Sequence, residues 1–175
     1  MFNKNQVVAV VMGGPSAERE VSLNTGAAIA NALREYGYTN VVEIDLDPRN
    51  FGKQLAESKA EVVFNAVHGL YGEDGRLQTL LEIREMPYTG SGMIASVSCM
   101  DKVITKRMLR DAGISTPACL IVNKKESGIK EKIMQRFSLP VVIKPASQGS
   151  SIGVEIVKEE NVLKGANALH VDPID

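Results

Sequence analysis

Short apolar runs alternate with helix-like repeats over the first half of the chain. Residues 7–12, 41–46 and 61–67 are rich in β-branched side chains, which is typical of strands buried on both faces of a sheet. Apolar side chains recur at helical spacing over residues 16–37, between the first two runs, and again over residues 75–84. This strand–helix–strand order predicts a parallel sheet with right-handed crossovers.

The second half mixes helices and strands on a smaller scale. Ser98 and Asp101 resemble a helix capping box, and helical spacing continues to Gly113, a residue type that often ends helices. A strand is expected next, followed by a helix near residues 129–137. After Glu160 the pattern weakens, and at most a short helix and no clear strand is predicted there.

These patterns predict an α/β protein with two domains. Residues 90–92 (GSG) provide a natural break after the parallel-sheet pattern. We therefore predict a first domain over residues 1–96 and an α+β second domain over residues 97–175.

Residues 141–157, VVIKPASQGSSIGVEIV, form the most distinctive stretch of the second half. Two β-branched runs enclose a loop of small residues, which predicts a hairpin with a wide turn. Glycine and serine let backbone N–H groups approach an anion, and Lys144 adds a full positive charge. The lysine precedes the loop, so this is not a P-loop. A polyphosphate site and a solvated surface hairpin both remain open at this point.

Candidate polar residues also follow two of the predicted strands in the first half. Glu18 and Glu20 lie near the start of the first helix, where they either complement the helix dipole or face a cationic group such as an ammonium. His68 comes directly after the third strand on a glycine-rich loop with Glu73 and Asp74. A structural role is common for a single histidine, but parallel-sheet sites are built at this edge.

Composition narrows the class of protein. The formal net charge is −1 and 44% of residues are hydrophobic, so no basic field favours nucleic acid or an anionic membrane. Cys99 and Cys119 form no C-x-x-C motif, which argues against a disulfide framework or a zinc site. No apolar run is long enough to span a bilayer. We expect a soluble, cytoplasmic protein.

Five motifs in register resemble one family. The segments GGPSAEREVSLNTG, HGLYGEDG, YTGSG, MDK and VIKPASQGSSIGV are together similar to those of D-alanine–D-alanine ligase, of the ATP-grasp superfamily, over about residues 7–157. The resemblance implies a Rossmann-like, pre-ATP-grasp domain followed by a truncated ATP-grasp lid subdomain. It also implies a cytoplasmic, ATP-dependent ligase of peptidoglycan synthesis that joins two D-alanines through an acyl phosphate.

The resemblance implies site residues as well. Glu18 matches the carboxylate that receives the ammonium of the first D-alanine, Ser150 the serine hydrogen-bonded to it, and His68 the histidine beside that substrate. Glu18 and Ser150 are the candidate catalytic residues. The residues that match the ATP-binding positions are Lys102, Lys144, Gly149, Ser150 and Ser151, the last three in the lid loop 149–153.

The match stops before the family's remaining motifs. A tyrosine, an arginine and the acidic and asparagine ligands of Mg²⁺ have no counterpart here, and the final DPID lacks the E-x-N spacing. We therefore expect the chain to correspond to the first half of the enzyme, to bind ATP weakly and not to catalyse ligation alone. The alternatives are a non-catalytic module that binds a small amino acid or nucleotide, and a ligase that uses D-lactate or D-serine. A homodimer through the first domain is also expected from the family.

Overall fold

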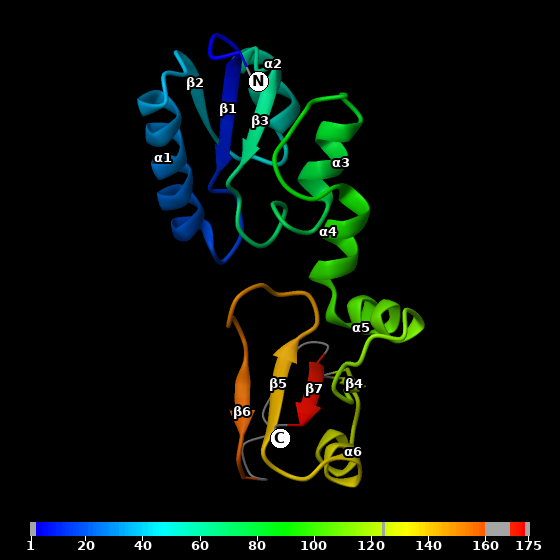
Figure 1. Cartoon of the computed structure of the whole chain (residues 1–175). Helices are drawn as coiled ribbons and strands as arrows, with labels where there is room; N and C mark the ends of the chain where they lie inside the picture. The colour runs from blue at the N-terminus through cyan, green and yellow to red at the C-terminus, as the bar shows by residue number, and fades with distance from the viewer. Residues whose placement is uncertain (1–2, 124, 160–168, 174–175) are drawn as a thin grey trace. The chain divides into compact units, whose positions relative to one another are not determined.

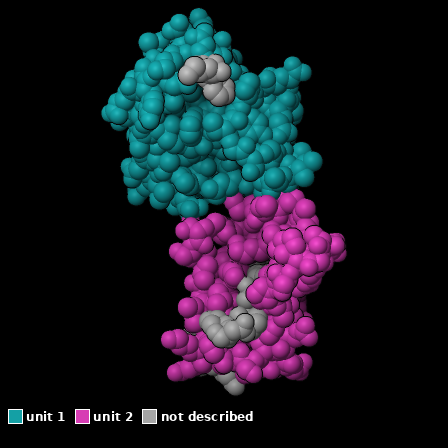
Figure 2. All heavy atoms as spheres, viewed as in Figure 1, with its two compact units in different colours: residues 1–97 teal, residues 98–175 magenta. Residues whose placement is uncertain are grey.

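The computed structural model describes residues 3–123, 125–159 and 169–173. The chain divides into two compact units, Met1–Val97 and Ser98–Asp175, which Figure 2 shows in different colours. Within the described residues, no helix combines the length and the apolar character needed to cross a bilayer. Each unit is described below by itself.

The first unit contains the predicted parallel sheet. Strands β1 (Val7–Met12), β2 (Asn40–Asp45) and β3 (Val62–Asn65) are parallel and lie in the order β2-β1-β3. The central strand β1 pairs with both neighbours, so all of its side chains after Val7 are buried. This explains why its sequence is a continuous β-branched run instead of an alternating one.

Helices cover both faces of this sheet (Figure 1). Helix α1 (Arg19–Glu35) packs on the face that carries Val10 and Met12. Helices α2 (Phe51–Ser58) and α3 (Arg76–Glu82) bury apolar side chains in the core on the opposite face. The two faces alternate along β1 because successive strand side chains point to opposite sides.

A short extended piece follows α3 in the first unit. Tyr88 forms an isolated parallel bridge with Val63, and the amide of Val63 donates to the carbonyl oxygen of Pro87 at 2.8 Å. The third strand is shorter than predicted and ends at Asn65. The amide of Ala66 still donates to the carbonyl oxygen of Val11 on β1, and the residues after Ala66 form the loop of the candidate site.

The second unit contains an antiparallel sheet. Its strands β4 (Leu120–Val122), β7 (Leu169–Pro173), β5 (Val141–Pro145) and β6 (Glu155–Val157) lie in the order β4-β7-β5-β6. Helix α6 (Ile129–Arg136) contributes Ile133 to the core of this unit. The predicted hairpin is confirmed, since Val141 pairs with Val157 in an antiparallel register.

Two predictions for this half were wrong. A strand, β7, follows Glu160 and lies between β4 and β5. The short helix that was expected after Glu160 falls on residues outside the described ones. The capping box was also misread, because Ser98 belongs to helix α4 (Met93–Met100) and Asp101 alone caps a separate helix, α5 (Lys102–Asp111).

Candidate functional site

The order of the parallel strands determines where a site can form in the first unit. The chain passes from β1 to β2 on one side and then returns to β3 on the other, so the order reverses between β1 and β3. In open α/β sheets, ligands bind at such a switch point, beyond the carboxyl ends of the strands. On the β2 side, Asp45 at the carboxyl end of β2 forms an ion pair with Arg19 at 2.5 Å.

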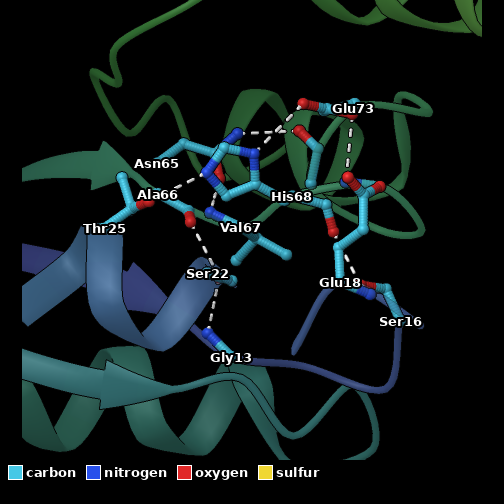
Figure 3. A network of polar contacts seen from close by, with 12 residues as sticks. Gly13, Ser16, Glu18, Ser22, Thr25, Asn65, Ala66, Val67, His68 and Glu73 are labelled. Carbon is cyan, nitrogen blue, oxygen red and sulfur yellow. Dashed lines mark hydrogen bonds and ion pairs between the residues drawn. The ribbon is translucent and has the colours of Figure 1, made fainter. Parts of the chain in front are cut away.

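A buried serine joins the segments around this switch point. The hydroxyl of Ser22 on α1 donates to the carbonyl oxygen of Ala66 after β3, at 2.7 Å, and accepts from the amide of Gly13 after β1, at 2.8 Å. Ser22 is fully buried, so water cannot replace either bond. Figure 3 shows this serine between the two segments. The carboxyl ends of β1 and β3 are therefore fixed to one helix.

Glu18 lies at the start of α1, at the N-cap position, but its side chain makes no capping bond. The carboxylate instead faces the loop after β3, where a Cβ added to Gly69 would lie 2.7 Å from its Oε2. Ser16 links the two segments, since its hydroxyl donates to the carbonyl oxygen of His68 at 2.7 Å and accepts from the amide of Glu18 at 3.1 Å. Glu20, the other acidic candidate, is exposed.

His68 is half-buried and is held from two sides (Figure 3). Its Nε2 lies 3.1 Å from the hydroxyl oxygen of Thr25 on α1, and its Nδ1 lies 3.8 Å from Oε1 of Glu73. The other carboxylate oxygen of Glu73 accepts from the amide of Gly69 at 3.0 Å. The structure thus brings Glu18 and His68 to the same edge of the sheet, where a carboxylate can meet an ammonium and an imidazole can donate or accept a proton.

Sequence reasoning missed Ser22 and Thr25 as parts of this site. The signal that could have found them is helical spacing. Ser22 lies four residues and Thr25 seven residues after Glu18, so all three share one side of α1. In the sequence alone, each is an ordinary polar helix residue.

A second cluster lies at the loop after β5 in the second unit. Lys102 opens α5, and its Nζ donates to the carbonyl oxygen of Gln148 at 2.8 Å. Desolvation and the charge of Lys144 lower the pKa of Lys102. Like charges repel each other, and a polyanion bound to both lysines would remove that repulsion. The pair therefore fits the phosphates that the sequence predicts.

The loop itself carries unusual backbone angles. Ser150 has φ +53°, and Gly153 has φ +70° with its added Cβ only 2.7 Å from Cγ of Pro145. Such geometry brings the backbone close to a neighbour that a larger residue would displace. Roles for Gly149 and Ser151 stay predictions. Ser150 and Glu18 belong to different units, so their pairing also stays a prediction.

Metal ligands do not cluster in the part of the chain that the structure describes. No group of three histidine, cysteine, aspartate or glutamate side chains there could hold an ion. These described residues therefore do not fit a Mg²⁺ site. Cys99 and Cys119 are free thiols.

Known proteins resemble both halves of the chain. Family models of the D-ala D-ala ligase N-terminus and C-terminus match residues 47–91 and 108–172. The D-alanine–D-alanine ligase of Moorella thermoacetica is 49% identical over 168 residues, which are 92% of this chain and 53% of that protein. Crystal structures of the Bacillus anthracis D-alanine–D-alanine ligase, one of them complexed with ATP, align with a TM-score of 0.80 at 32% identity. The aligned part is 97% of this chain and 58–59% of the Bacillus anthracis chains.

The parallel α/β unit, the antiparallel sheet of the second unit and the match to the solved ligase structures assign the chain to the ATP-grasp class. Within that class, the chain belongs to the D-alanine–D-alanine ligase family. The chain spans about half the length of the curated relatives it matches.

Proposed function

We propose that this chain forms the first-substrate and ATP-phosphate halves of a D-alanine–D-alanine ligase that acts in the cytoplasm in peptidoglycan synthesis. The observation that carries the proposal is Lys102, whose Nζ is held against the small-residue loop by its bond to the carbonyl oxygen of Gln148 at 2.8 Å, with the charge of Lys144 acting on it. Bound ATP would supply the phosphoryl group that activates the carboxylate of one D-alanine for attack by the amine of a second.

The residues divide this work between binding and shielding. The two lysines would neutralise the phosphates, and the backbone N–H groups of Gly149, Ser150 and Ser151 would cover them and exclude water. An acyl phosphate is readily hydrolysed, so a closed loop protects it.

In the first unit, Glu18 would accept the ammonium of the first D-alanine, with Ser150 hydrogen-bonded to the same carboxylate. His68 would lie beside the substrate, oriented by Thr25 and Glu73. The remaining ligands, including those of Mg²⁺, would come from outside these 175 residues. The chain alone is therefore expected to bind ATP weakly and not to complete ligation. The proposed acceptor is a second D-alanine, and D-lactate and D-serine are the alternative acceptors. A homodimer through the first unit is also expected from the family.

Calorimetric titration with ATP tests the lysine pair. Each Lys→Met change, at position 102 or 144, should raise the Kd at least about tenfold, because a charge-assisted bond to phosphate is lost. Lys158→Met, an exposed lysine of the same unit, is the matched control and should leave the Kd unchanged. Equal affinities in all variants would contradict the proposed phosphate site.

Release of ADP from ATP, with and without D-alanine, tests the rest. We expect no D-alanine-dependent release from the folded chain alone. Steady release that depends on D-alanine would show that the chain needs no further ligands. Binding of D-alanine without any binding of ATP would support an amino-acid-binding module instead.

A further inference from the structure

Asp101 uses its two carboxylate oxygens for different tasks. Its Oδ1 accepts from the amides of Val103 and Ile104, at 2.8 and 3.0 Å, and so caps helix α5. Its Oδ2 accepts from the hydroxyl of Ser147 at 3.1 Å. Ser147 lies in the loop that follows Lys144, 46 residues away in the sequence. A carboxylate needed only for capping would not require this second partner.

Lys102, the next residue, holds the same loop. Its backbone amide donates to the carbonyl oxygen of Ala146 at 2.9 Å, and its Nζ donates to that of Gln148 at 2.8 Å. Three successive loop residues, 146–148, are thus attached to two successive residues at the start of α5. The attachment lies at the base of the loop, immediately before Gly149.

One of these three contacts competes with an anion. An ammonium that turns toward phosphate oxygens gives up or shares its bond to Gln148, because it has three donors and a limited reach. The Lys102 amide and the Asp101–Ser147 bond involve no group proposed to touch the nucleotide. They can persist when Nζ moves.

We propose that Asp101 is a positioning residue that keeps the loop 146–151 in register with Lys102 and Lys144 when Nζ of Lys102 turns from Gln148 to the phosphates. This inference rests on the proposed ATP site. Asp101 also acts on Lys102 electrostatically, since its charge raises the pKa of that lysine against desolvation and Lys144. The Asp101 carboxylate thus favours the charged form of Lys102. It contacts the loop through Ser147 and is not proposed to contact the ligand.

Two substitutions separate this role from helix capping. Ser147→Ala removes the loop contact but leaves the Asp101 cap and charge in place. Asp101→Ser keeps a good N-cap residue but is too short to reach Ser147 while it caps. Ser147→Thr restores a hydroxyl and is the rescue variant. Ser127→Ala, an exposed serine of the same unit before α6, is the matched control.

Hydrogen exchange of the whole 175-residue chain, followed by mass spectrometry, measures the loop directly. For Ser147→Ala and Asp101→Ser we expect amides of the segment 146–153 to exchange about fivefold faster, the order expected for one lost hydrogen bond. Exchange within α5 should stay unchanged in Ser147→Ala, and Ser147→Thr and Ser127→Ala should match the unsubstituted chain.

The same variants are titrated with ATP. A roughly fivefold higher Kd in Ser147→Ala and Asp101→Ser, restored in Ser147→Thr, is expected. Unchanged loop exchange in both variants would overturn the inference, because Asp101 would then act only as a cap. Faster loop exchange with an unchanged Kd would overturn it as well. If the unsubstituted chain binds no ATP at all, the proposed function fails, and the exchange rates still decide whether Asp101 holds the loop.

Discussion

Ser22→Ala tests how the first unit holds its site together. The substitution removes one oxygen and leaves two buried backbone groups, the amide of Gly13 and the carbonyl of Ala66, without partners. Each orphaned group costs about 1–3 kcal/mol. Alanine returns roughly 0.5 kcal/mol through its better helix propensity, and the buried hydroxyl no longer has to be desolvated. We therefore expect the free energy of unfolding to fall by about 2–4 kcal/mol.

Tyrosine fluorescence provides an assay confined to this unit. The chain has four tyrosines and no tryptophan, and Tyr36, Tyr38, Tyr71 and Tyr88 all lie within Met1–Val97. Urea unfolding followed by this signal reports the first unit, so the second unit does not disturb the two-state analysis.

Ser58→Ala is the matched control for this measurement. Ser58 also donates to one backbone carbonyl and accepts from one amide, but it is only half-buried. Water can replace its bonds, so a loss below about 1 kcal/mol is expected. A Ser22→Ala loss no larger than that of Ser58→Ala would refute the claim that this hydroxyl ties the strand ends to α1.

Two further predictions concern the same unit. Gly75→Ala should destabilise this unit by about 1–2 kcal/mol more than Gly90→Ala. Both glycines have positive φ, but only at Gly75 would the added Cβ clash with a neighbour, Cγ2 of Val97. Equal losses in urea unfolding would contradict this. Burial and the hydrogen bond to Glu82 raise the pKa of Tyr88 to about 12. The folded unit keeps this proton where the unfolded chain has lost it, so the stabilisation is complete below pH 10 and is lost as the pH rises toward 12. Absorbance at alkaline pH should show a tyrosine step near 12 that Tyr88→Phe removes, and a step that survives in Tyr88→Phe would refute the assignment.

The parallel sheet could be predicted because its signal is local. A strand that is covered on both faces must be apolar along its whole length, so β1 is visible as an uninterrupted run. The hairpin of β5 and β6 is equally visible, since two β-branched runs flank one short loop. The positions of Glu18 and His68 follow from the sheet, because Glu18 opens the helix after β1 and His68 lies in the loop after β3, and the carboxyl ends of these strands lie at one edge.

Strand β7 could not be predicted because its partners are distant. Its five residues alternate between apolar and polar types, a pattern too short to stand out. Its place between β4 and β5 is set by pairing with residues that precede it by more than twenty positions. The Ser98–Asp101 prediction failed for a similar reason: the pattern cannot show that one helix ends at Met100 and another begins at Lys102.

The two clusters differ from ordinary surface polar groups in what supports them. His68 depends on a threonine from another element, and Lys102 depends on a loop that follows in sequence by more than forty residues. Each supporting contact lies inside one unit, so each half of the proposed site is built without the other. Ordering a side chain costs conformational entropy, and these contacts with a distant segment offset that cost. Ser22 in the first unit and Asp101 in the second hold the segments that carry these residues, although neither is proposed to touch a substrate.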